Sequence, residues 1–521
     1  MTFQWPSAIR KTPIFLLIVL NTQLMPGLAT IRPKVSLLHL IAHDQALDSQ
    51  SVSGLVTENQ QSYESICTTQ LSSAIDAVIN RPQFHRARWG ILIEPLSPDV
   101  INGASFNKNH VLYSREAQHY FIPASNAKLL TTAAALRQLG PEFRIRTSIY
   151  QTDAGSLRIV GRGDPSLTDV QLKELAQQLK RQGIRNVPQL VVDKGYFQGE
   201  PVNLSWDWED VQSDYGASVT SLILNQNAVE LALSPQQPGQ PLRVSWADAI
   251  AAKQWQIENN SVTAKVAAPT SVTVNAVLGK PLLRIKGQLA ADAEPEAFGL
   301  PIVDPAEYFL QHFRRVLAAE GINVVQASVV SNVATTGEQE LAKIESPPLS
   351  TLLVETNQES NNLYAEVLLR TLGAGASTDT AELGLKTIRE SLTALGVNPE
   401  SYDLVDGSGL SRQNLVSPEA IAQTLKLMAQ TKQAGVYRAS LPVAGVSGTL
   451  RRRFNNTGAQ GNLLAKTGTL TGVSALSGYL DVRGYQPLVF SIIVNQSDQS
   501  GETLRQAIDE IILLLTRLRS C

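Results

Sequence analysis

Apolar residues recur at helical spacing near both ends of the chain. Leu71, Ile75, Val78 and Ile79 follow one such pattern, and residues 504–518 follow another. Because residues three and four apart share one face of an α-helix, each pattern predicts a helix with one buried face.

Two further helical regions are predicted inside the chain. An alanine- and leucine-rich stretch begins at residue 125 and ends near Gly140-Pro141, a pair typical of a helix end. A longer helical region, with interruptions, runs from 304 to about 433.

Runs rich in β-branched and other apolar residues predict strands in two parts of the chain. Residues 89–95, 475–482 and 487–495 form such runs, and many shorter ones, separated by glycine-containing turns, fill 143–301.

The order of these elements predicts the domain organisation. A chain of 521 residues is too long for one ordinary compact domain. We expect an α/β domain made of 63–142 and 302–521, split by a β-rich insert at 143–301. The insert itself is expected to form two subdomains, divided near residue 220.

The N-terminus has the layout of a secretory signal peptide. Arg10 and Lys11 precede the apolar run 13–20, and small residues follow at 27–29. Because that run is too short to span a bilayer, we expect a signal peptide at 1–29 that is removed on export.

A second apolar run, at 35–42, lies in the otherwise polar segment 30–62. It leaves the cleavage point or the start codon open, and a buried strand is its alternative interpretation. No later run is long and apolar enough for a transmembrane helix. We therefore expect an exported, soluble protein that is periplasmic or otherwise extracytoplasmic.

Composition excludes some classes of function. Hydrophobic residues make up 43% and charged residues 17%, as is typical of globular proteins. The 44 basic residues are balanced by 46 acidic ones, so no excess of basic charge indicates a nucleic-acid partner. The chain has no His-Glu-x-x-His motif, and we expect neither a metal nor a cofactor.

Two cysteines, Cys67 and Cys521, stand at the outer ends of the two terminal helical patterns. In an exported protein they form either a pair or two isolated thiols. A disulfide is feasible if the terminal helices pack side by side.

The motif Ser125-Asn-Ala-Lys128 opens the alanine-rich helix. Its spacing places both side chains on one face of the first turn, where a neutral lysine amine can take the serine proton. Lysine has an ordinary pKa of ~10.4, so this role requires burial or a neighbouring cation. A helix cap is the alternative role for Ser125. A second copy, Ser105-Phe-Asn-Lys108, lies in a turn-prone polar loop.

Two more motifs follow in chain order. Ser360-Asn-Asn362 opens a helix-like stretch and can direct a hydroxyl and an amide into one cleft, with a helix cap as the alternative. Lys466-Thr-Gly468, followed by Thr469, is typical of an edge strand on which glycine admits a substrate backbone, with an ordinary strand end as the alternative.

Together and in this order, the three motifs resemble the Ser-x-x-Lys, Ser-Asp-Asn and Lys-Thr-Gly set of class A β-lactamases and penicillin-binding proteins, with Asn361 at the place of the aspartate. The blocks 163–167, 406–414 and 441–450 resemble a narrower group, the D-Ala-D-Ala carboxypeptidase/endopeptidase family of low-molecular-mass penicillin-binding proteins. Its distinguishing feature is a large insert between the first two motifs, and the resemblance runs from about residue 67 to the C-terminus.

The resemblance implies a serine β-lactamase/penicillin-binding (transpeptidase-like) fold, with an antiparallel sheet flanked by helices. It implies a serine-type D-Ala-D-Ala carboxypeptidase, a D,D-endopeptidase or both, acting on peptidoglycan stem peptides through an acyl-enzyme and inhibited by β-lactam antibiotics. The implied roles are as follows: Ser125 as nucleophile, Lys128 as general base, Ser360 as proton donor to the leaving amine, Asn362 as a contact of the peptide amide, Lys466 and Thr467 as contacts of the terminal carboxylate, and the N–H groups of Ser125 and Thr469 as oxyanion hole.

Family members with this insert recognise a diaminopimelate side chain through an acidic residue and an arginine. The matching residues are Asp210, with Tyr215 nearby, and Arg412 in the block Ser-Gly-Leu-Ser-Arg. A carboxylate suits the ammonium of that side chain and a guanidinium suits its carboxylate. A solvated loop acid is the alternative role for Asp210.

Three other functions fit the sequence less well. A β-lactamase would share the motifs, but β-lactamases lack the insert, and no glutamate is identifiable that would hold a hydrolytic water. A wall-binding protein with a vestigial site is opposed by the intact motif residues. A Ser-His-Asp hydrolase is disfavoured because none of the six histidines lies in a recognisable catalytic block.

Overall fold

The computed structural model of the chain describes residues 65–96, 100–101, 104–105, 111–152, 155–331, 338–375 and 379–521. The predicted signal peptide at 1–29, the segment 30–62 and Lys108 of the second Ser-x-x-Lys copy lie outside the described residues. The described part belongs to one compact unit, 62–521. None of its helices combines the length and the apolar composition that crossing a membrane requires.

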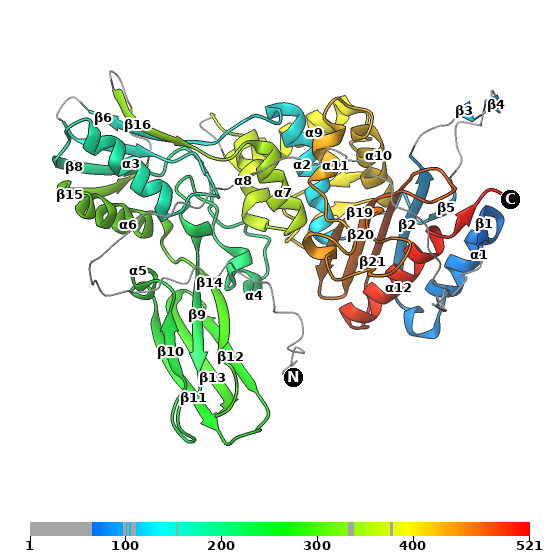
Figure 1. The fold of residues 1–521 in the computed structure, drawn as a ribbon, viewed down its shortest axis with the longest axis horizontal. Coiled ribbons are helices and arrows are strands. Elements are labelled where there is room, and N and C mark those ends of the chain that lie inside the picture. Colours follow the sequence, from blue (N-terminus) through cyan, green and yellow to red (C-terminus); the bar gives the residue numbers. More distant parts are fainter. Residues whose placement is uncertain are drawn as a thin grey trace, which may run out of the picture. The chain divides into compact units, whose positions relative to one another are not determined.

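The half of the molecule that carries the three motifs, called the catalytic half, is built on a five-stranded antiparallel sheet (Figure 1). Its strands, in spatial order, are β19 (Leu463–Leu470), β20 (Val473–Leu480), β21 (Leu488–Asn495), β2 (Arg88–Pro95) and β5 (Tyr113–Arg115). Every residue of β20 and β21 is buried, because helices cover both faces of the sheet. This layout confirms the predicted fold class, with β19 at one edge.

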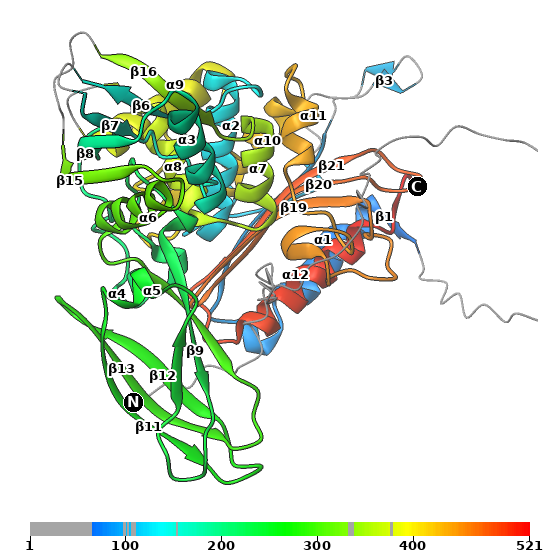
Figure 2. The same ribbon diagram turned by 60° about the vertical axis from the view of Figure 1, so that its left-hand side comes forward.

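One face of the sheet is covered by the two terminal helices, α1 (Thr68–Ile79) and α12 (Gly501–Leu515), which lie side by side in both ribbon views (Figures 1 and 2). Beyond them β1 (Ile66–Cys67) pairs in parallel with β22 (Leu518–Arg519). The cysteines form the disulfide Cys67–Cys521, with Cα atoms 5.6 Å apart. The pairing is confirmed, and the two isolated thiols are excluded.

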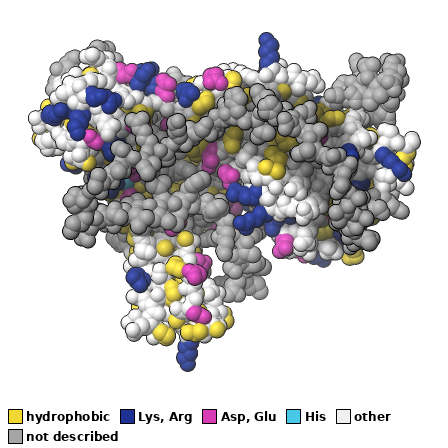
Figure 3. All heavy atoms as spheres, viewed as in Figure 1, with side chains coloured by type: hydrophobic (Ala, Val, Ile, Leu, Met, Phe, Trp, Pro, Cys, Tyr) yellow, Lys and Arg dark blue, Asp and Glu magenta, His cyan; other side chains and the backbone are white. Residues whose placement is uncertain are grey.

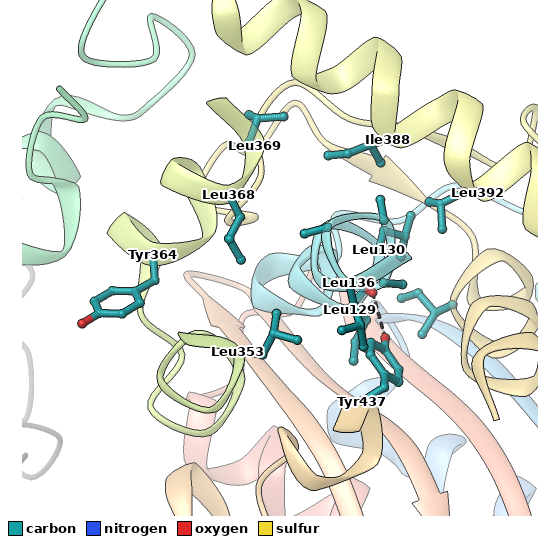
Figure 4. Close-up of a cluster of buried hydrophobic side chains, with 14 of the residues drawn as sticks. Leu129, Leu130, Leu136, Leu353, Tyr364, Leu368, Leu369, Ile388, Leu392 and Tyr437 are labelled. Atoms are coloured by element: carbon teal, nitrogen blue, oxygen red, sulfur yellow. Dashed lines mark hydrogen bonds between the residues drawn. The ribbon is translucent and has the colours of Figure 1, made fainter. Parts of the chain in front are cut away.

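The opposite face carries the helical cluster around α2 (Ala127–Leu139), in which every residue from Ala127 to Leu136 is buried. Figure 4 shows its leucines packed against neighbouring helices, with the Tyr437 hydroxyl donating to the Leu129 carbonyl at 2.8 Å. The surrounding elements are α7 (Leu349–Gln358), α8 (Asn362–Leu372), α9 (Thr380–Leu395), α10 (Pro418–Met428), α11 (Ala434–Ala439), β17 (Tyr402–Asp403) and β18 (Leu415–Val416). The N-terminus of α2 is thereby held firmly beside the edge of the sheet.

The inserted region begins with a second five-stranded sheet, in the order β15-β8-β7-β6-β16. Its elements are β6 (Arg146–Gln151), β7 (Leu157–Val160), α3 (Asp169–Arg181), β8 (Asn186–Asp193), α6 (Pro305–Ala319), β15 (Asn323–Val330) and β16 (Gln339–Glu345). The sequence assigned 302–345 to the catalytic domain, but strand pairing places this segment in the inserted region. The cause is packing: the apolar face of α6 joins the core of this sheet, and periodicity alone does not reveal which sheet a helix covers.

Two three-stranded sheets complete the inserted region and form the green lobe at the bottom of Figure 1. They contain β9 (Ala228–Ser234), β10 (Arg243–Trp246), β14 (Glu296–Pro301), β11 (Gln256–Ala264), β12 (Ser271–Val277) and β13 (Lys280–Ala290), with α5 (Ala249–Ala252) between β10 and β11. The segment 194–227, with α4 (Trp208–Val211) and the short 3-10 helix η4 (Asp214–Gly216), returns from the second sheet to the catalytic half.

The remaining described elements are short. They are the strands β3 (Val100–Ile101) and β4 (Ala104–Ser105) and the 3-10 helices η2 (Pro82–Phe84), η3 (Ala124–Asn126), η5 (Asn225–Asn227) and η6 (Gly448–Leu450). On the face seen in Figure 3, both basic and acidic side chains are visible among the described residues.

Candidate active site

Ser125 lies in the 3-10 turn η3, immediately before α2. The preceding residue, Ala124, has a positive φ of 48°. The side-chain amide of Asn126 donates to Ser477 Oγ on β20 at 2.8 Å. The turn is thus tied to the central strands of the sheet. Ser125 Oγ accepts from Lys128 Nζ at 3.0 Å, and the cap position of α2 is taken by Asn126, so Ser125 does not cap the helix.

The Lys128 side chain is fully buried and its amine has three oxygen neighbours. Besides Ser125 Oγ, they are Asn362 Oδ1 at 2.6 Å and the Ser408 carbonyl at 2.7 Å. The last two oxygens can only accept hydrogen bonds. A neutral amine therefore donates its two N–H groups to them, and its lone pair faces the serine hydroxyl. The geometry suits a general base.

Electrostatics match this geometry. Burial lowers the pKa of Lys128 to about 7, while the carboxylates of Asp406 and Glu366 act to raise it. A buried amine loses the hydration that stabilises its charge, and this loss outweighs the two acids. A substantial fraction of Lys128 therefore carries a free lone pair at neutral pH.

The second motif forms the turn before α8. Ser360 has a φ of 60°, and its hydroxyl accepts from Lys466 Nζ at 2.8 Å. Asn361 Oδ1 caps α8 by accepting from the Tyr364 amide at 3.2 Å, so the cap role falls to Asn361 and not to Ser360. The amide of Asn361 also donates to Gln226 Oε1 at 2.8 Å, a bond to the inserted region that an aspartate cannot make.

The third motif lies on the edge strand β19. Lys466 is fully buried, and burial together with the charge of Lys128 holds the pKa of Lys466 well below its usual value. The Thr467 hydroxyl donates to Thr449 Oγ1 at 2.8 Å. The Thr469 side chain is exposed on the same strand. Lys128 Nζ thus joins Ser125 to Asn362 by hydrogen bonds, and Lys466 Nζ is bonded to Ser360. The two groups are linked electrostatically, since the charge of Lys128 acts on Lys466.

Gly468 also has a packing role that the sequence did not indicate. A Cβ there would lie 2.9 Å from the Pro123 carbonyl oxygen and 3.1 Å from Ala124 Cβ. The glycine therefore lets β19 approach the turn that carries Ser125, and its contact with a substrate backbone stays a prediction.

Comparison with known proteins identifies the family. The sequence profile of the D-Ala-D-Ala carboxypeptidase 3 (S13) family matches residues 71–515. The chain belongs to this family. It is thus a serine-type D-Ala-D-Ala carboxypeptidase of the penicillin-binding class, as the sequence motifs predicted.

Several relatives cover most of this S13 carboxypeptidase. The D-alanyl-D-alanine carboxypeptidase of Actinomadura sp. is 33% identical over 82% of this chain and 81% of its own length. Penicillin-sensitive carboxypeptidase A of Dictyostelium discoideum is 30% identical, over 82% and 87%. The crystal structure of penicillin-binding protein 4 (dacB) from Haemophilus influenzae superposes with a TM-score of 0.72 at 25% identity, covering 85% of this chain and 98% of that one.

Two of the predicted specificity residues, Asp210 and Tyr215, are linked to the Ser125 site through Asn362. The Tyr215 hydroxyl donates to Asp210 Oδ1 at 3.0 Å. The backbone carbonyl of Tyr215 accepts from the side-chain amide of Asn362 at 3.0 Å. Burial raises the pKa of Asp210, whereas the bond from Tyr215 and the charge of Arg412 act to lower it. Asp210 is thus half-buried and has partners, unlike a solvated loop acid. Arg412 donates to the Thr471 carbonyl at 3.1 Å.

Two buried acids behind Lys128 were not predicted as site residues. Glu366 accepts from the amides of Gly407 and Ser408 at 2.9 and 2.7 Å, and burial together with Asp406 raises the pKa of Glu366 to about 7. Asp406 appeared in the sequence only as part of a family block. A glutamate within the apolar run 363–369 was the available signal, because an acid on a buried helix face needs partners.

Proposed function

We propose that this S13 carboxypeptidase uses Ser125 to cleave the terminal D-Ala-D-Ala bond of peptidoglycan stem peptides, with D,D-endopeptidase cleavage of cross-links as a second reaction of the same site. The observation that carries the proposal is the set of contacts at Lys128 Nζ, which leaves a lone pair for the serine proton. Similarity to the penicillin-sensitive carboxypeptidase A of Dictyostelium discoideum supports sensitivity to penicillin.

In the proposed reaction, Lys128 takes the hydroxyl proton as Ser125 Oγ bonds to the carbonyl carbon of the penultimate D-alanine. The N–H groups of Ser125 and Thr469 stabilise the oxyanion. The C–N bond then breaks, and a proton reaches the leaving amine through Ser360, whose hydroxyl contacts Lys466. Water hydrolyses the acyl-enzyme and restores the serine. A β-lactam would acylate the same oxygen and leave slowly.

Binding of the substrate follows charge. Lys466 and Thr467 would take the terminal carboxylate, with Thr469 beside them on β19. Asp210 and Arg412 would take the ammonium and the carboxylate of a diaminopimelate side chain, which fits their opposite charges and the position of the Asp210–Tyr215 pair next to Asn362. Asp210→Asn should then raise KM for peptides with a free ammonium group and leave peptides without one unaffected.

We also propose that the protein works outside the cytoplasm, directed there by residues 1–29. The disulfide Cys67–Cys521 supports this location, since disulfides persist in oxidising compartments. Alkaline phosphatase fused after residue 62 should be active in cells only if the preceding segment directs export.

Intact-protein mass spectrometry with benzylpenicillin tests the assignment of the nucleophile. The wild type should gain one lasting adduct, Ser125→Ala should gain none, and Ser105→Ala, which removes the serine of the second Ser-x-x-Lys copy, should gain the adduct normally. The wild type should also release D-alanine from a peptide ending in D-Ala-D-Ala. Rapid penicillin hydrolysis without an adduct would favour a β-lactamase, and neither adduct nor turnover would favour a vestigial site.

A further inference from the structure

A single peptide group connects a buried carboxylate to the general base. The amide N–H of Gly409 donates to Asp406 Oδ1 at 2.7 Å. The carbonyl oxygen of the same peptide group, that of Ser408, accepts from Lys128 Nζ at 2.7 Å. Asp406 and Lys128 thus bind the two ends of one planar peptide group.

Burial makes this connection electrostatically effective. Asp406 and Lys128 are both fully buried, so water does not screen the charges. A carboxylate at the N–H end of an amide polarises it and makes the carbonyl oxygen a stronger acceptor. The Ser408 carbonyl then holds the amine more firmly and favours its charged form.

Every partner of Asp406 donates a hydrogen bond, which suits the carboxylate anion. Besides Gly409, the donors are the Ser411 amide at 2.7 Å, the Asn414 side chain at 2.8 Å and the Trp206 indole N–H at 3.0 Å. The last of these comes from the segment 194–227, which also carries Asp210. The inserted region therefore helps to hold the acid behind the catalytic base.

Glu366, on helix α8, provides a comparison because it binds the same loop. Its carboxyl accepts from the amides of Gly407 and Ser408, which belong to other peptide groups than the one that contacts Lys128. Lys466 and Arg370 are the remaining charged groups of this cluster, facing Lys128 and Glu366 respectively.

We propose that Asp406 is a positioning residue for catalysis, which acts on Lys128 through the Ser408–Gly409 peptide group and is itself fixed by Trp206 from the inserted region. This role rests on the proposed function, since it requires Lys128 to be the base for Ser125. The alternative is that Asp406 only folds the loop 406–414.

The pH dependence of acylation separates the two roles. Acylation by a fluorescent penicillin needs neutral Lys128, so the wild-type rate should rise with a midpoint near pH 7. Because the charge of Asp406 raises the pKa of Lys128, Asp406→Asn should move the midpoint about one unit lower, besides lowering the plateau rate. Glu366→Gln should move it less. A folding role would lower the rate at every pH and leave the midpoint in place.

Two outcomes would overturn the proposal: an unmoved midpoint in a folded Asp406→Asn protein, or equal shifts in the Asp406→Asn and Glu366→Gln variants, which would indicate through-space charge alone. A Trp206→Phe variant keeps the charge and should keep the midpoint, while the plateau rate falls because Asp406 loses one anchor.

A measurement on the wild type covers the case in which Asp406→Asn does not fold. Labelling serine carbonyls with 13C and glycine amides with 15N selects the Ser–Gly peptides, which occur at 53–54, 408–409, 447–448, 477–478 and 500–501. The 408–409 signal, assigned by its loss in Ser408→Ala, should titrate with the midpoint of acylation, and an invariant signal would refute the connection. If the wild type is never acylated, the proposed function fails instead, while this titration stays readable.

Discussion

Replacing Gly409 with alanine should slow the acylation of Ser125 by about 100-fold. Gly409 has a φ of 79°, and a Cβ there would lie 2.6 Å from the carbonyl carbon of Ala124 and closer still to its oxygen. Ordinary contacts of a Cβ begin at 3.4 Å, so the two backbones must move apart by at least about 0.8 Å at that carbon and by more at its oxygen. Neither contact atom belongs to a flexible side chain, so the strain cannot be relieved by a rotamer change.

Either way of relieving the contact disturbs the site. If the turn at Ala124 moves, it carries the next residue, Ser125, away from Lys128. If the loop at Gly409 moves instead, the Ser408 carbonyl leaves its 2.7 Å contact with Lys128 Nζ. A misplacement of about 1 Å costs roughly 10²-fold in rate, which equals about 2.7 kcal/mol of activation free energy at 1.36 kcal/mol per tenfold.

The assay is the second-order rate of labelling by a fluorescent penicillin, measured beside thermal melting. Gly140→Ala is the matched control, since Gly140 has the same φ of 79° at the end of α2, but a Cβ there meets nothing within 4 Å. Both variants should lose about 1–3 kcal/mol of stability to backbone strain, and only Gly409→Ala should lose rate. Wild-type labelling by folded Gly409→Ala, or equal losses of rate in both, would refute the reasoning.

Two further predictions concern stability. A Cys67→Ser/Cys521→Ser double variant should lose about 2–5 kcal/mol of stability and melt at a lower temperature. It should still be acylated at the wild-type rate, because the disulfide ties α1 and α12 together on the sheet face that lies away from α2. An unchanged melting temperature would contradict this. Buried His312 lies 2.7 Å from Asp169 and 3.1 Å from Asp248; burial lowers the pKa of His312, but the two carboxylates outweigh it and raise the pKa. The stabilisation by His312 should thus be complete below about pH 6.5 and be lost as pH rises through the raised pKa. The melting temperature of the wild type should therefore fall more steeply with rising pH in this range than that of His312→Gln, in which Lys128 and Glu366 still titrate. Parallel curves would show that His312 is not responsible.

The sequence by itself determined the elements and the chemistry of this protein. Helical periodicity marked α1 and α12, and apolar runs marked β20 and β21, because burial of one helix face or of a whole strand leaves a local pattern. Three short motifs indicated the residues around Ser125, since the reaction requires those chemical groups and short spacings bring several of them together locally. The sequence does not determine whether Cys67 and Cys521 form a disulfide, because their pairing depends on which helices pack together.

Only the tertiary structure decided where the inserted region ends and what supports the base. Strands β15 and β16 join β8 and β6 across more than a hundred residues, and no local pattern encodes such a pairing. The close approach of the turn at Ala124 to Gly468, which leaves no room for a Cβ, is likewise visible only in the folded chain. Asp406 accepts from the amide of the peptide group whose carbonyl contacts Lys128, and Glu366 accepts from other amides of the same loop, which is distant in sequence from Lys128. Contacts of this kind depend on how the chain returns to itself, which three-dimensional packing alone settles.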